Sequence, residues 1–69
     1  MHVFYVVGQL SIDGGLKLSS VSVEREGPLD TAEELAAFVR AMRSLLNQKE
    51  GVRYSDDEDW MILYISKVN

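Results

Sequence analysis

The chain has 69 residues, a formal net charge of −4 at pH 7 and no cysteine. A chain of this length forms a single small domain, and the lack of cysteine excludes disulfides and thiolate metal ligands. The acidic balance disfavours nucleic acid as a partner, because binding to a phosphate backbone requires clustered lysine and arginine. No stretch reaches the roughly 18 apolar residues of a membrane span, and the start lacks the basic segment of a signal peptide. We therefore expect a cytoplasmic protein that does not associate with membranes.

Two strands and a tight turn are predicted in the first third of the chain. Residues 3–12 are rich in the β-branched and aromatic side chains that strands favour. The sequence Asp-Gly-Gly at 13–15 favours the positive φ angles of a hairpin turn. Residues 16–24 predict the second strand, but the apolar alternation changes phase in its middle. An extra residue at 19–20 would restore the phase as a β-bulge, and Gly8 offers the same adjustment in the first strand.

The clearest predicted element is an amphipathic helix over residues 32–48. Thr31 and Glu34 have the spacing of a capping box, with Asp30 as a competing N-cap. Six apolar side chains recur at the spacing of one helical face: Leu35, Phe38, Val39, Met42, Leu45 and Leu46. Gly51 suits the left-handed conformation that ends many helices. The helix therefore has one face to bury against a sheet.

The last third of the chain predicts two further strands. Residues 52–54 predict a short third strand, residues 55–59 an acidic loop, and residues 60–68 the last strand. The order ββαββ predicts an α+β fold over residues 1–69, with the helix on one face of a mainly antiparallel sheet. The first and last strands are the most hydrophobic, so we expect them at the centre of the sheet.

These two hydrophobic strands are apolar on both faces, whereas one helix covers only one face of a sheet. The aliphatic alternation set predicts the helix-covered face: Phe4, Val6, Leu10, Ile12, Met61, Leu63 and Ile65. The opposite set contains three aromatic residues and predicts an interface: Val3, Tyr5, Val7, Trp60, Ile62 and Tyr64. Tyrosine and tryptophan are enriched at interfaces, and an exposed patch of such residues is unusual on a monomer. We therefore predict a homo-oligomer, with a dimer favoured, built on this open face or through a sheet edge.

Acidic residues support a second hypothesis, a small inhibitor or adaptor that docks on a basic site of another protein by mimicking nucleic acid. Six carboxylates would form its contact surface: Glu24, Glu26, Asp56, Asp57, Glu58 and Asp59. Such docking would weaken steeply with salt, unlike an apolar interface. The run 56–59 lacks the spacing and central glycine of a calcium-binding loop, so we predict no metal site there. It is also typical of a solvated hairpin tip that keeps a sheet edge from pairing.

No residues form a recognisable catalytic or cofactor site. His2 is the single histidine and follows the first methionine, where chains fray. The glycines at 14–15 are not followed by the lysine of a phosphate-binding loop. We therefore predict a protein-interaction module that is not an enzyme and holds no cofactor. A third hypothesis is an enzyme subunit whose site forms between protomers, which a cleft with carboxylates of raised pKa would indicate.

Overall fold

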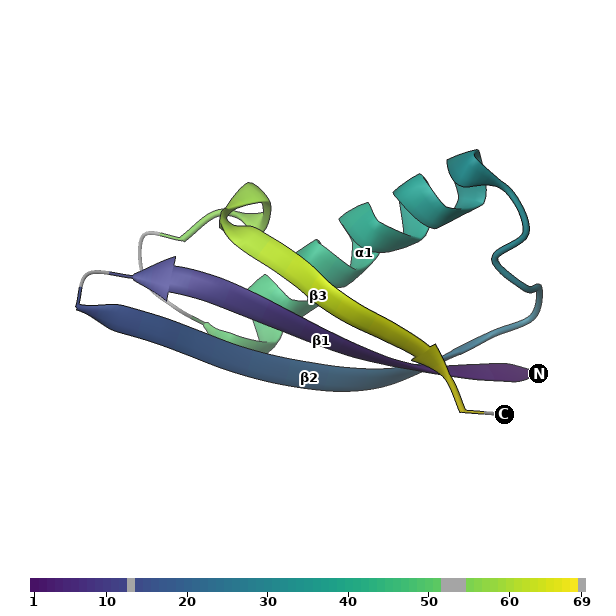
Figure 1. Ribbon diagram of the computed structural model, residues 1–69, viewed down its shortest axis with the longest axis horizontal. Helices are drawn as coiled ribbons and strands as arrows, with labels where there is room; N and C mark the ends of the chain where they lie inside the picture. The colour runs from purple at the N-terminus through teal and green to yellow at the C-terminus, as the bar shows by residue number, and fades with distance from the viewer. Residues whose placement is uncertain (13, 52–54, 69) are drawn as a thin grey trace.

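The computed structural model describes residues 1–12, 14–51 and 55–68 and contains one sheet with one helix across it (Figure 1). The elements in chain order are β1 (His2–Ile12), β2 (Gly15–Arg25), α1 (Ala32–Glu50), the short 3-10 helix η1 (Asp57–Asp59) and β3 (Trp60–Lys67). The sheet has three strands in the order β2-β1-β3, and both pairings are antiparallel. The predicted α+β class, with a helix packed on one face of the sheet, is therefore confirmed.

Of the two strands expected at the centre of the sheet, one lies there. β1 is the central strand as expected, whereas β3 lies at an edge of the described sheet, so the prediction that the last strand is central is wrong. The short third strand predicted over residues 52–54 lies outside the described residues. Strands that are apolar on both faces are usually covered on both sides. β3 is apolar on both faces and lies at an edge of the described sheet, so its composition indicates a surface that needs covering.

α1 begins where the sequence predicts and ends two residues later than residue 48. The Glu34 amide donates to Thr31 Oγ1 at 3.0 Å, so Thr31 rather than Asp30 is the N-cap. The helix continues to Glu50, slightly beyond the predicted end. Gly51 follows with φ of 59°, the left-handed conformation that glycine adopts without strain. Local sequence alone therefore determines both ends of this element.

β1 and β2 pair without interruption, from His2 opposite Arg25 to Ile12 opposite Gly15. The β-bulge predicted at 19–20 is therefore wrong. A regular register fixes which side chains of β2 share a face, because directly paired residues project to the same side of an antiparallel sheet.

The change of phase in β2 has a different origin. Leu16 and Leu18 face away from α1, whereas Val21 faces the helix and packs against the buried core. Between them, Ser19 also faces the helix, is buried, and donates its hydroxyl hydrogen bond to Glu50 Oε2 at 2.5 Å. The strand is thus regular, and a polar contact with the end of α1 replaces an apolar one.

The irregularity of the sheet lies between β1 and β3. Val7 pairs with Tyr64, but the next residue of β1, Gly8, pairs with Ile62. Leu63 is therefore an extra residue in β3, and the alternation of side chains reverses on one side of it. The adjustment expected at Gly8 does occur there, but it acts on the pairing with β3 and not with β2.

Gly8 also permits the closest approach of the helix to the sheet. A Cβ atom at position 8 would overlap Leu46 Cδ1 and would lie 3.3 Å from the ring of Trp60. Leu46 and Trp60 can occupy this space because glycine has no side chain. The same residue therefore accommodates the bulge and the packing of α1 over β1.

Seven buried apolar residues form the core in two neighbouring clusters: Phe4, Val6, Phe38 and Met42 in one, and Leu10, Leu46 and Trp60 in the other. The rings of Phe4 and Phe38 lie 5.5 Å apart between centroids and are inclined by 59°. This tilted arrangement is one that aromatic pairs prefer. The buried helical residues recur at every fourth position, as the amphipathic pattern predicts.

Three residues predicted in the core are exposed: Ile12, Met61 and Leu63. The bulge explains Met61 and Leu63, because it reverses the alternation of β3 before Tyr64. Ile12 is exposed because β1 extends past Leu10, where the pairing with β3 stops. The alternation of side chains along a strand identifies its two faces, but the pairing register between strands decides which face the helix covers.

Candidate interaction surface

The face of the sheet opposite α1 carries large apolar side chains. Tyr5 and Val7 lie on it, because they alternate along β1 with buried residues that face the helix. Their neighbours on β2 and β3 share the same face by direct pairing. We call six of these residues the open-face patch: Tyr5, Val7, Leu16, Leu18, Met61 and Tyr64. The patch spans all three strands.

The centre of the open-face patch is a row across the sheet. Leu18 and Met61 flank Gln9 from the two neighbouring strands, with 64% and 57% of their surface exposed. Tyr64 lies beside Val7 and is 53% exposed. A shallow hollow of about 200 Å³ opens beside this row and is lined by Tyr5, Val7, Leu18, Ser19 and Ser20. The surface thus offers both protruding side chains and a recess.

The structure places four of the six residues of the predicted interface on this open face: Val3, Tyr5, Val7 and Tyr64. The assignment of the other two, Trp60 and Ile62, is wrong. Trp60 pairs with Leu10 and Ile62 pairs with Gly8, so both face the helix. Ile62 is partly buried and packs against both core clusters.

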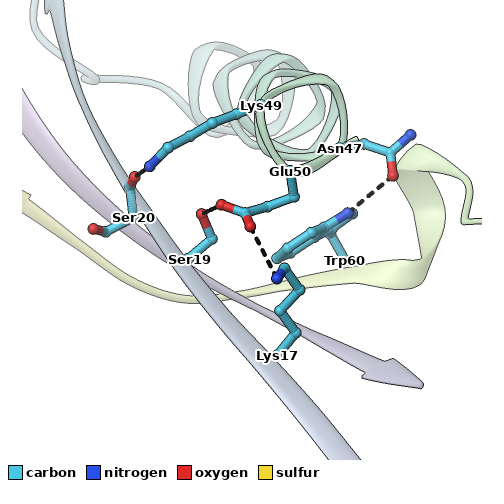
Figure 2. A network of polar contacts seen from close by, with 7 residues as sticks. All are labelled: Lys17, Ser19, Ser20, Asn47, Lys49, Glu50 and Trp60. Carbon is cyan, nitrogen blue, oxygen red and sulfur yellow. Dashed lines mark hydrogen bonds and ion pairs between the residues drawn. The ribbon is translucent and has the colours of Figure 1, made fainter. Parts of the chain in front are cut away.

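Trp60 is part of the core and not of an interface. Only 1% of its surface is exposed, and its indole Nε1 donates to Asn47 Oδ1 of α1 at 3.1 Å (Figure 2). Asn47 Oδ1 also accepts a hydrogen bond from the Ser55 hydroxyl at 2.6 Å. The polar atom of a buried tryptophan usually needs such a partner. The aromatic character that suggested an interface therefore serves the packing of β3 under the helix.

Sequence reasoning missed three residues of the open-face patch: Leu16, Leu18 and Met61. For β2 the signal was present, since Leu16 and Leu18 stand in opposite phase to Val21. The expected bulge removed this signal, because it would place both leucines on the same face as Val21. For Met61 no local signal exists, because its face depends on the extra residue Leu63 in the pairing with β1.

Charge is distributed unequally between the two faces of the sheet. The lysine and arginine residues of the strands all lie on the helix-covered side: Lys17, Arg25 and Lys67. Lys17 Nζ lies 3.2 Å from Glu50 Oε1, and Arg25 Nη2 lies 3.2 Å from Glu34 Oε2. On the open face of the described strands, Glu24 at one end is the single charged residue. The centre of this face is therefore uncharged.

A polar network joins the end of α1 to β2 (Figure 2). Glu50 accepts the hydrogen bond from Ser19 and pairs with Lys17, while Lys49 Nζ donates to the Ser20 carbonyl oxygen. The bond from Ser19, followed by that from Lys17, lowers the pKa of the Glu50 carboxyl below its ordinary value of 4.5. These contacts stabilise the charged carboxylate. The network joins the end of the helix to β2 on the covered face.

The structure does not bring the predicted acidic surface together. Glu24 lies beside Val3 at the beginning of β1, whereas η1 precedes Trp60, which pairs with Leu10 near the end of β1. Glu26 follows β2 at the same end as Glu24. The six carboxylates therefore form two separate groups at opposite ends of the sheet. In the acidic turn, the Asp56 amide donates to Asp59 Oδ2 at 2.7 Å.

Among residues 1–12, 14–51 and 55–68, no group of three or more histidine and acidic side chains is placed to hold a metal ion. In the same residues, no helix combines the length and the apolar character needed to cross a membrane. No protein-family model, curated protein sequence or solved structure matches this chain. The interpretation of the surface therefore depends on its geometry and chemistry.

Proposed function

We propose that the protein is a small cytoplasmic interaction module that self-associates through the open-face patch, with a dimer as its basic unit. The observation that carries this proposal is the exposure of Leu18, Met61 and Tyr64 at the centre of an uncharged sheet face. Contiguous apolar surface of this kind marks interaction sites, whereas isolated apolar residues do not. Its role is binding, and the proposal assigns no catalysis to the chain.

A second copy of the chain is the partner that this surface fits best. Burial of apolar surface contributes about 25 cal/mol per Å², and it needs no charged group on the other side. Two copies of the open face would meet without opposing like charges at their centre, because Glu24 lies at one end. A twofold axis in the plane of the sheet would pack two sheets face to face, with both helices outside.

The test is the solution mass of the protein, measured by light scattering during size-exclusion chromatography over a range of concentrations and salt. We expect the wild type to exceed the 7.8 kDa of one chain and to keep its mass at high salt. Leu18→Asp and Tyr64→Asp should each reduce the mass, because an unpaired carboxylate would be buried in the interface. Both positions are exposed in the single chain, so both variants should fold.

Ala41→Asp is the matched control, because it adds the same charge at an exposed position of α1, which lies across the sheet from the open-face patch. It should leave the mass unchanged. Ile62 is not a suitable probe, since a carboxylate there would enter the core. An unchanged mass for Leu18→Asp and Tyr64→Asp, relative to the wild type, would overturn the proposal.

A further inference from the structure

The two edges of the described sheet differ in their protection. β2 carries three charged residues near its two ends, namely Lys17, Glu24 and Arg25, and none between them. Charged side chains on an edge strand discourage pairing with another strand. β3 carries a single charged residue, Lys67 at its end, and among the described strands it pairs only with β1. The β3 edge is therefore the less protected of the two.

A groove runs beside this edge. It has a volume of about 490 Å³ and lies between α1 and β3, with Leu35, Val39 and Arg43 on the helix and residues 61–65 on the strand. The beginning of α1 lies away from the strands (Figure 1), which leaves Leu35 44% exposed although it belongs to the apolar face of the helix. Leu63, the bulged residue, is also exposed. Apolar side chains from two elements thus line a space that the described chain does not fill.

We propose that the β3 edge and this groove bind the β3 edge of a second copy in antiparallel orientation. The sheet would then continue from one copy to the other, with both helices on the same face. The twofold axis would be perpendicular to the sheet, so residues 62–65 of β3 would lie beside the same segment of the partner. Contacts of this kind are self-complementary in a twofold dimer.

Charge complementarity supports a second copy as the occupant. η1 comes immediately before β3, and Lys67 ends β3. Antiparallel pairing along the full strand would therefore place Lys67 of each copy next to Asp57 and Glu58 of the other. Lys67 faces the helix side, because it pairs with Phe4, and η1 contacts α1 on that side. Opposite charges would meet at both ends of the shared strand pair, with apolar residues between them.

This edge interface shares Met61 and Tyr64 with the open-face patch, but its helical residues lie outside the patch, and it does not depend on the proposed function. The first experiment measures the dissociation constant of self-association for Leu35→Glu and for its control Ala41→Glu. Both add a glutamate at an exposed position of α1, but only Leu35 lines the groove. We expect Leu35→Glu to weaken association by at least about tenfold, since it buries an unpaired charge, and Ala41→Glu to have no effect. Equal dissociation constants for the two variants would overturn the edge interface.

The second experiment tests the orientation by exchanging charges. Lys67→Glu and the double variant Asp57→Lys, Glu58→Lys should each associate less strongly than the wild type, because each opposes like charges at both ends of the strand pair. An equimolar mixture of the two variants should recover association as a heterodimer, since opposite charges then meet at both ends. Recovery also shows that both variants fold. A mixture that associates no better than either variant alone would overturn the antiparallel arrangement.

These measurements test the two proposed interfaces independently. Leu18→Asp reports on the open-face patch, and Leu35→Glu reports on the edge. If only Leu18→Asp lowers the mass, the edge interface is wrong and the open-face proposal stands. If only Leu35→Glu lowers the mass, the open-face proposal is wrong and the edge interface stands. A wild type that remains a 7.8 kDa monomer at every concentration would overturn both.

Discussion

The two faces of the sheet are built from the same strands and differ in what covers them. On the covered face, Phe4, Val6 and Leu10 of β1 are buried beneath α1, and polar side chains there have partners on the helix. On the open face, Leu18 and Met61 are mostly exposed and stand among uncharged polar residues. Apolar composition is therefore common to both faces. Packing against the helix distinguishes the face that stabilises the fold from the face that is available for binding.

The largest expected effect tests this distinction directly. Leu46→Ala removes a fully buried side chain from the cluster with Leu10 and Trp60 and should lower the free energy of unfolding by about 2–5 kcal/mol. Leu18→Ala makes the same chemical change on the open face and should alter the free energy of unfolding of the monomer by less than about 0.5 kcal/mol. Urea unfolding followed by the fluorescence of Trp60, the single tryptophan, measures both. Equal losses would mean that the open face contributes to the core of the monomer.

A smaller loss of stability is expected at Gly8, the residue of the covered face on which α1 packs closely. Gly8→Ala would place a Cβ atom against Leu46 Cδ1, and the buried Leu46 has little room to move. Overpacking of this kind typically costs about 1–3 kcal/mol. Gly15→Ala is the matched control, because nothing lies within 4 Å of a Cβ atom there and its φ is not positive. We expect urea unfolding to show a loss for Gly8→Ala alone, and a loss of similar size in Gly15→Ala would contradict the packing argument.

The helix shows how much of the fold can be predicted from local sequence. Thr31, the spacing of the apolar residues and Gly51 determine its start, its buried face and its end, and each is a property of residues close together in the chain. The hairpin is predicted for the same reason, and Gly14 has φ of 86° in the turn. These features depend on interactions within a few residues, so the sequence period and the capping residues reveal them.

The faces of β3 show where prediction from sequence ends. Alternation divides Trp60, Met61 and Ile62 correctly into two sets, but it does not state which set meets the helix. That choice depends on Leu63, whose position as an extra residue is defined only by pairing with Val7 and Gly8 of a distant strand. Within the open-face patch, the sequence accordingly predicts Tyr5, Val7 and Tyr64, whereas Leu16, Leu18 and Met61 depend on the register. An interface argued from composition needs the register before its residues can be named.

The smallest expected effect concerns the polar end of the covered face, and it should depend on pH. The pKa of Glu50 is lowered in the folded protein by the bond from Ser19 and the contact with Lys17, so the unfolded chain binds a proton more readily than the folded chain does. The stabilisation is therefore present above pH 4.5 and is lost as the pH falls through the pKa of the folded state. Glu50→Gln should have a lower urea midpoint than the wild type at neutral pH, and the gap should close in acid, once the pH has fallen through the pKa of the folded state.

Glu26→Gln is the control for this measurement, because it removes one negative charge at an exposed position after β2. Its midpoint should follow that of the wild type at both pH values. A gap for Glu50→Gln that persists in acid would show that the shape of the side chain, and not its charge, holds the end of α1 to β2. The covered face would then resemble the open face in depending little on charge. A gap that closes would show that the covered face combines an apolar core with an ionic contact, whereas the open face remains uncharged at its centre.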